Sequence, residues 1–213
     1  ATSHIIESLG LTQLGTVMDE RFPAVALIQN EVPRHPVRVY QGNGIGVFTA
    51  EIQFEKEQDI AFGSTVLEWF TAGGFEQLII IDGILKPEKE VQGEGLFAVG
   101  ASEKARKRLK EMDLNTIQRG IVSGITGFLL SEGDRLNLDI TALLSEASPM
   151  YPDVRAAAVA IEAITEMTGV EIPLSKMLEN AREIEHSVQE IIQNSTPLLP
   201  SPGDDVENDP SFG

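Results

Sequence analysis

The sequence contains no cysteine among its 213 residues. This absence excludes disulfide bonds, thiolate metal sites and cysteine nucleophiles. Long apolar runs are missing too, because even the apolar stretch Leu78 to Ile81 is ended by Asp82 and Gly83, whereas a membrane span needs about 18 consecutive apolar residues. No signal-peptide pattern opens the sequence. We therefore expect a cytoplasmic protein that does not cross a membrane.

Positive charge is scarce: 16 lysines and arginines stand against 33 aspartates and glutamates, for a formal net charge of −17. Nucleic-acid backbones and anionic lipid surfaces would be repelled by such a chain, so neither is an expected partner. The main basic cluster lies on a predicted helix over 103–111, between Glu103 and Glu111. Its charge pattern favours a solvated helix face or an oligomer contact over an anion site.

Groups for acid-base catalysis are also few. The three histidines, His4, His35 and His186, lie in no sequence context that resembles a nucleophile elbow. The glycine-rich segment 42–46 lacks the GxGxxG spacing and precedes a β-rich run, so it predicts a hairpin turn and not a nucleotide loop. No metal-ligand set or phosphate-binding loop is present. We expect a protein that is not an enzyme and has no metal or cofactor.

Hydrophobic periodicity predicts strands that alternate with helices, which is typical of an α/β sandwich. The run 77–81 has no polar alternation, as expected for a central parallel strand covered on both faces. The sequence opens directly in a helix, so the strand that normally precedes such a helix is expected to be missing at the N-terminus. The predicted helices are 5–9, 60–70 and 103–111, and the extended segments are 11–18, 24–29, 37–40, 45–54, 77–81 and 96–99.

The segment 120–158 is the most informative part of the chain. It predicts, in order, a strand beginning at Ile121, a turn and a helix through Phe128, a strand over 140–144, and a helix opened by Pro152 and Asp153. A second long helix follows, with apolar residues spaced three and four apart from Leu174 to Ile191. This stripe favours docking on its own domain over a coiled coil with another subunit, because it is shorter than a convincing coiled coil.

One α/β domain over 1–195 and a tail over 196–213 are the expected organisation. The tail is rich in proline, glycine and acidic residues, so it cannot bury enough apolar surface to order itself. Phe212 stands next to its end, flanked by Ser211 and Gly213. An aromatic side chain there is either an accident of sequence or a ligand for a pocket on a partner.

Two short motifs are candidates for a crevice. Asp82 and Gly83 follow the apolar run 77–81, where open α/β sheets place ligands, but Asp-Gly is also common turn chemistry, and the turn is the favoured interpretation. Gly124 and Gly127 could offer backbone N–H groups to an anion at a helix start or could allow close packing. Packing is the favoured interpretation for these two glycines.

Several blocks resemble the proteasome assembly chaperones and their archaeal and actinobacterial relatives. The resemblance covers the chain from Ala1 to about Asn194. The segments that support the resemblance are the opening ATSHIIESL, the strand PVRVY at 36–40, EI at 51–52, IIDG at 80–83, GITGFLL at 124–130, LLSEA at 143–147 and YPDVRAAA at 151–158.

The resemblance implies a non-enzymatic, homo-oligomeric protein with a phosphorylase- or hydrolase-like fold. That fold is a three-layer α/β sandwich with a mixed, mostly parallel sheet, here followed by two C-terminal helices and a disordered tail. Some family members end in a hydrophobic-tyrosine-any-residue tail that docks between α-subunits of the proteasome. Carried over, this tail corresponds to Ser211, Phe212 and Gly213, of which only the aromatic position matches.

Three functions are therefore open at this point. The first is a proteasome assembly chaperone, or an ATP-independent activator, that binds the proteasome core particle or its α-subunits. The second is an oligomeric adaptor or scaffold for another client. The third is a small-molecule hydrolase or phosphorylase-like enzyme that uses the crevice near Asp82, which the missing nucleophile and phosphate loop argue against.

Overall fold

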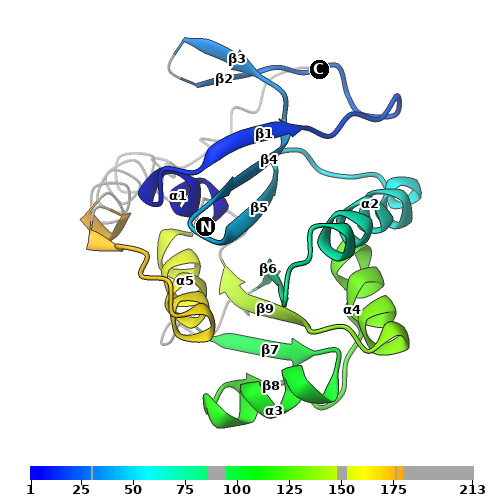
Figure 1. The fold of residues 1–213 in the computed structure, drawn as a ribbon, viewed down its shortest axis with the longest axis vertical. Coiled ribbons are helices and arrows are strands. Elements are labelled where there is room, and N and C mark those ends of the chain that lie inside the picture. Colours follow the sequence, from blue (N-terminus) through cyan, green and yellow to red (C-terminus); the bar gives the residue numbers. More distant parts are fainter. Residues whose placement is uncertain (30, 86–94, 148–152, 176, 180–213) are drawn as a thin grey trace, which may run out of the picture.

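The computed structural model describes residues 1–29, 31–85, 95–147, 153–175 and 177–179. Helices and strands alternate along most of this length (Figure 1). The helices are α1 (Thr2–Ser8), α2 (Asp59–Ala72), α3 (Glu103–Glu111), α4 (Gly124–Leu136) and α5 (Val154–Thr168). The strands are β1 (Thr12–Thr16), β2 (Leu27–Gln29), β3 (Val32–Arg34), β4 (Val37–Gly42), β5 (Ile45–Ala50), β6 (Leu78–Leu85), β7 (Leu96–Gly100), β8 (Asn115–Thr116) and β9 (Ile140–Ala147).

Three strands near the N-terminus form an antiparallel sheet, here called sheet A, with strand order β1-β4-β5. The hairpin between β4 and β5 turns through Asn43 and Gly44, whose φ angles of 50° and 76° are those of a type I′ turn. The hairpin predicted there is confirmed. Helix α1 is fixed to β5 by a 2.9 Å hydrogen bond between the hydroxyls of Thr2 and Thr49.

The second large sheet, here called sheet C, is mixed and has the order β6-β9-β7-β8. Strand β9 pairs in parallel with β6 and antiparallel with β7, and β7 pairs in parallel with β8. The expected α/β class with a mixed sheet is therefore confirmed. Two of the three pairings in sheet C are parallel, whereas sheet A is antiparallel throughout.

Helices cover both faces of sheet C. Leu143 of β9 packs in one buried cluster with Ala160 and Ile161 of α5. Its neighbours in β9, Ala142 and Leu144, point to the other face and pack in a second cluster with Leu130 of α4. This alternation follows from the pleat of the strand, which sends successive side chains to opposite faces.

Side chains of sheets A and C pack in the same apolar clusters, although no strand pairing joins the two sheets in the described residues. On the face of α1 and α5, Tyr40 and Val47 of sheet A pack in one cluster with Ile79 and Ile81 of β6. The face of α2 holds a third cluster, which contains Val37 and Phe48 of sheet A and Leu78 and Ile80 of β6. The two sheets thus contribute side chains to the same two apolar layers.

Two expectations about strands are wrong. The strand predicted from Ile121 is absent: residues 117–123 carry no strand, and Ile121 is 97% exposed. The chain there lies against the first turn of α4, where the Val122 carbonyl leaves no room for a side chain at Gly127. The strand expected to be central, β6, pairs only with β9 and is an edge within the described residues.

Helix predictions were more accurate, apart from one position. Helix α2 forms as predicted, but Ile60 is exposed and Phe62 is buried instead. Helix α5 begins after Asp153, whose carboxylate accepts the Ala156 N–H, while Pro152 lies outside the described residues. Of the helix predicted over 174–191, only the start is described, and Met177 there is buried. None of the described helices is long and apolar enough to cross a membrane.

Candidate functional site

Several exposed apolar residues lie in a projecting hairpin made by β2 and β3. We call residues 25–29 and 31–34 the arm. Sheet B contains only these two strands, and it extends beyond β1 at one end of the molecule (Figure 1). Ile28 is 67% exposed, and Val25 and Val32 are each nearly half exposed. Because Ile28 pairs with Pro33 and Val32 pairs with Gln29, Ile28 and Val32 point to opposite faces of the hairpin. Single exposed apolar residues are routine in folded proteins, but a short hairpin with exposed apolar side chains on both faces indicates a contact element.

The arm is held by polar contacts at both ends. At its base, Arg34 donates to the Gln13 side chain over 3.1 Å, and beside its turn Gln29 donates to Glu51 over 3.4 Å. Glu51 also forms a salt bridge with Arg38, whose side chain is only 2% exposed. These bonds hold the hairpin against sheet A while its apolar side chains stay in solvent. Leu14 of β1 and Met18, both more than half exposed, belong to the same N-terminal stretch.

The arm was not identified as a site from the sequence, which predicted only an extended segment over 24–29. The available signal was the pair of short β-rich runs on either side of Glu31, which takes a positive φ of 66° at the turn. Pro33 obscured this signal, because proline is rare in paired strands except at edges. Here Pro33 stands opposite Ile28 in a two-stranded sheet, where an edge position is available.

The predicted crevice residues lie in two elements that contact each other. Asp82 and Gly83 are within β6, opposite Leu144 and Ser145 of β9, so the favoured turn at this position is wrong. The strand continues because β9 supplies pairing partners up to Ala147. Thr126 Oγ1, on α4 between the two predicted glycines, donates a 2.7 Å hydrogen bond to Asp82 Oδ2.

The surroundings of Gly124 and Gly127 do not suit an anion. The Gly127 N–H donates to the Ser123 carbonyl over 3.3 Å, so that donor is already used. A Cβ at Gly124 would lie 3.9 Å from Asp59 Oδ2, and Asp82 bonds to the next turn of the helix. Two carboxylates therefore flank the start of α4, and their charge opposes anion binding. The contact of Gly127 with Val122 agrees with a packing role for this glycine.

The contact between His4 and Ser8 does not support acid-base catalysis by histidine. His4 Nε2 lies 3.1 Å from Ser8 Oγ and 2.7 Å from the Pro173 carbonyl oxygen. A carbonyl only accepts, so Nε2 must donate its proton there and cannot act as a base toward Ser8. The described part of the chain holds no group of three or more metal-ligating side chains.

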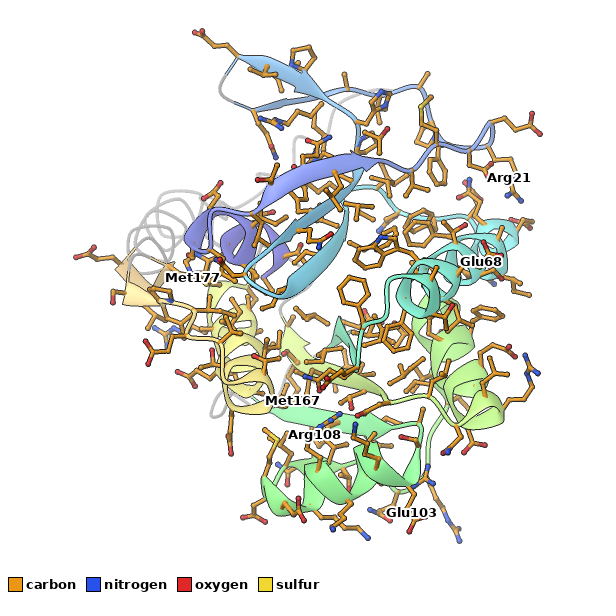
Figure 2. The ribbon with its side chains drawn as sticks, viewed as in Figure 1. Arg21, Glu68, Glu103, Arg108, Met167 and Met177 are labelled. Carbon is orange, nitrogen blue, oxygen red and sulfur yellow. The ribbon has the colours of Figure 1, made fainter. Side chains whose placement is uncertain are left out.

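Two cations of the basic helix α3 pair with Asp139, which lies just before β9. Arg108 donates to both oxygens of Asp139, at 2.9 and 2.6 Å, and Lys104 Nζ lies 3.1 Å from the same group. Figure 2 shows Arg108 on the side of α3 that faces β7. Burial raises the pKa of Asp139, but hydrogen bonds and charge from Arg108 and Lys104 outweigh it, so the net pKa is lowered.

This pairing refines the expectation for the basic cluster. Lys104 and Lys107 are largely exposed, as a solvated face predicts, while Arg108 holds the helix to the sheet. A hollow of about 440 Å³ lies beside it, lined by Lys104, Lys107, Glu103 and Asp139 among others. Because the hollow is lined by charges of both signs, it does not indicate one class of ligand. The predicted partner-binding residues Ser211, Phe212 and Gly213 lie outside the described residues.

Comparison with known proteins places these features in a family context. The model of the PAC2 family matches residues 1–192. The fold is similar to that of Pyrococcus furiosus PbaA, described as an archaeal homolog of proteasome-assembly chaperone, with a TM-score of 0.83 and 24% identity over 91% of this chain and 81% of that one. P. furiosus PbaB, described as an archaeal proteasome activator, gives 0.75 and 21% over 90% and 86%.

A curated relative of similar extent is the uncharacterized protein MJ0106 of Methanocaldococcus jannaschii. It is 20% identical over 195 residues, which are 92% of this chain and 80% of that protein. At these identities the solved structures establish the fold. The sequence resemblance to proteasome assembly chaperones is confirmed by the family model and by these structural matches.

Proposed function

The chain belongs to the PAC2 family, and on this ground we propose that it is a non-enzymatic proteasome assembly chaperone or ATP-independent proteasome activator. The observation that carries the proposal is the family match over residues 1–192, together with the shared fold of PbaA and PbaB. The partner is the proteasome core particle or its α-subunits. A protein with this partner acts in the cytoplasm, as a homo-oligomer.

The polar groups of the described structure support a binding role better than catalysis. Asp82, the predicted crevice carboxylate, accepts hydrogen bonds from Thr126 and from the Gly83 N–H. His4 is used to join α1 to Pro173 and cannot act as a base toward Ser8. In the described part of the chain, neither group therefore supports the hydrolase or phosphorylase-like alternative. The coverage of both faces of sheet C supports the three-layer, phosphorylase-like architecture.

The proposal gives different binding roles to the arm and to the C-terminal tail. The arm supports self-association, because Ile28 and Val32 are exposed on a hairpin that is held at its base. Symmetric homo-oligomers are the commonest soluble assemblies, and an exposed apolar hairpin is a suitable isologous contact. The tail residues Ser211, Phe212 and Gly213 contact the proteasome: the ring enters an apolar slot, and the terminal carboxylate meets a lysine or arginine.

Binding of purified proteasome core particle to the immobilised full chain tests the proposal. We expect saturable binding that weakens with salt, because acidic residues such as Asp204, Asp205 and Glu207 precede the aromatic. Phe212→Ala should weaken binding, whereas Phe212→Tyr, which restores the family's tyrosine, should maintain or strengthen it. Adding one residue after Gly213 should act like Phe212→Ala.

Each variant is compared with wild type for melting temperature and oligomer size, which we expect to be unchanged. Binding that all tail variants retain would move the proteasome contact to the folded domain. Absence of binding to both core particle and isolated α-subunits would contradict the proposal and favour an adaptor for another client. Turnover of an ester, nucleoside or peptide substrate that is lost in Asp82→Ala would instead establish an enzyme.

A further inference from the structure

The pairing of β2 with β3 shows which main-chain groups of the arm point outward. The middle pair of this short ladder is Ile28 with Pro33. Proline has no N–H, so these two residues cannot exchange both main-chain hydrogen bonds, and theirs is the non-hydrogen-bonded pair of the ladder. The N–H and C=O of Ile28 therefore point away from β3, toward the outer edge of β2.

The two outer edges of the arm differ in what they offer to another strand. On β3 the outward-pointing residue is Pro33, which has a carbonyl but no N–H, and a proline of this kind protects a sheet edge. On β2 the outward-pointing residue is Ile28, which has both groups. Within the described residues β2 pairs with β3 alone. The edge of β2 is therefore the one that can accept an added strand.

The two faces of the arm differ as well. Gln29 and Arg34 lie on one face, and their side chains reach Glu51 and Gln13 beside sheet A. Side chains alternate along a strand, so Ile28 and Pro33 lie on the opposite face. Both are exposed, Ile28 to 67%. The arm projects at one end of the molecule (Figure 1), with this apolar face turned away from its contacts to sheet A.

Charge indicates which kind of strand fits this edge. The chain carries a formal net charge of −17, so two copies repel each other over most of their surfaces. Residues 22–30, which include β2, contain no charged side chain. A second copy can therefore approach β2 with its own β2 without bringing like charges together.

We propose that the arm joins two copies of this chain by antiparallel pairing of β2 with β2, with the two-fold axis at Ile28. The inference rests on the self-association in the proposed function and gives its geometry. Ile28 of each copy exchanges both main-chain hydrogen bonds with Ile28 of the other. The two hairpins then form one four-stranded sheet in the order β3-β2-β2-β3.

This register is self-complementary and closed. Leu27 of each copy lies opposite Gln29 of the other, as an isologous contact requires. Residues directly opposite each other share a face, so the Ile28 side chains meet and are flanked by Pro33 on both sides, in one apolar row. Because Pro33 protects the outer edge of each β3, the pairing stops at two arms and does not continue into a fibre.

A pair of substitutions at Ile28 separates strand pairing from simple apolar contact. Ile28→Pro keeps an apolar side chain and leaves the hairpin's own bonds in place, but it removes the outward N–H. Ile28→Thr makes the side chain polar and keeps that N–H and the branched Cβ. Light scattering over a range of concentrations should show association weakened by about tenfold or more in Ile28→Pro, and less in Ile28→Thr. Melting temperatures near that of wild type show that both variants fold.

Cysteine cross-linking tests the same axis without disturbing the backbone. The chain has no cysteine, so Ile28→Cys introduces a single thiol. Across the proposed axis the two Cα atoms would be about 5.5 Å apart, which suits a disulfide. Val32→Cys is the matched control, because Val32 is exposed on the same arm but belongs to β3. Two β3 strands in the joined sheet are about 14 Å apart, too far for a disulfide.

We expect mild oxidation to give a covalent dimer with Ile28→Cys and not with Val32→Cys. Equal cross-linking of both variants would overturn the proposal. A greater loss of association in Ile28→Thr than in Ile28→Pro would also overturn it, while leaving the arm as an apolar contact. A wild-type chain that scatters as a monomer at every concentration would remove both the pairing and the self-association. No readout involves the proteasome, so proteasome binding succeeds or fails separately.

Discussion

Strands β9 and β6 lie side by side in parallel register and are both apolar, but they differ in burial. Ile140, Ala142 and Leu143 of β9 are completely buried, whereas Leu78 to Ile81 of β6 are only partly buried. Within the described residues, β9 has a strand on each side and β6 has one. Strands of similar composition therefore differ in burial according to how many neighbours they pair with.

The same contrast extends to the two halves of the molecule. Around β9, the charged group Asp139 is paired by Arg108 and Lys104, and Ile140 and Leu143 are completely buried. Around sheet A, Ile28 and Val32 remain in solvent on the arm. We therefore assign stability to the part of the molecule around β9, and self-association to the arm.

The largest expected effect on the free energy of unfolding comes from truncating apolar side chains in β9 and β6. Leu143→Ala should lower the free energy of unfolding by about 3 kcal/mol, because it empties a completely buried site. Ile81→Ala in β6 should cost roughly half as much, since its side chain is already partly in solvent. Urea denaturation measures both values, and equal losses would show that β6 is as well covered as β9.

The next largest loss of stability is expected from removing one of the two cations that pair with Asp139. Arg108→Met keeps the aliphatic stem but leaves a nearly buried carboxylate with one partner, and should cost about 2 kcal/mol. Lys104→Met removes the other, largely exposed partner and should cost less than about 1 kcal/mol. If the two substitutions cost the same, the bidentate Arg108 contact would not be the one that holds α3.

The same pair predicts a pH dependence. The pKa of Asp139 is lowered from 3.8, so its contribution to stability is complete above that value and is lost as the pH falls through the lowered pKa. The difference in unfolding free energy between wild type and Asp139→Asn should therefore be constant near neutral pH and shrink below about pH 4. Denaturation at several pH values checks this, and a difference that grows in acid would contradict the assigned sign.

The arm should show the smallest effect on stability and a clear effect on assembly. Ile28→Asp changes a side chain that is 67% exposed, so the unfolding free energy should move by no more than about 0.5 kcal/mol. Ile60→Asp on α2 is the matched control, because Ile60 is 64% exposed and lies outside the arm. Light scattering should show a smaller oligomer for Ile28→Asp only. Equal masses for both variants would remove the arm from self-association.

Local features of the fold could be predicted from the sequence. The turn at Asn43 and Gly44 needs two positive φ angles, which these residue types allow, and the Asp153 cap lies three residues from its donor. The apolar run of β6 was identified as a strand, but its edge position depends on which strands are adjacent. Nothing within five residues of Leu78 encodes that.

The site was less predictable for the same reason. The contact of Thr126 with Asp82 joins residues 44 positions apart, and that of Arg108 with Asp139 joins residues 31 apart. The crevice candidates lie within β6 and at the start of α4, and the hydrogen bond between these two elements was not foreseen. Ile121 was assigned to a strand on composition, although its side chain is almost fully exposed.

Hydrogen exchange of the full chain, with and without purified proteasome core particle, tests the central claim most directly. The account predicts slower exchange at the C-terminal residues around Phe212, with exchange in β9 and α3 unchanged, because the half around β9 serves stability alone. No change anywhere in the chain, or protection confined to β9 and α3, would contradict it.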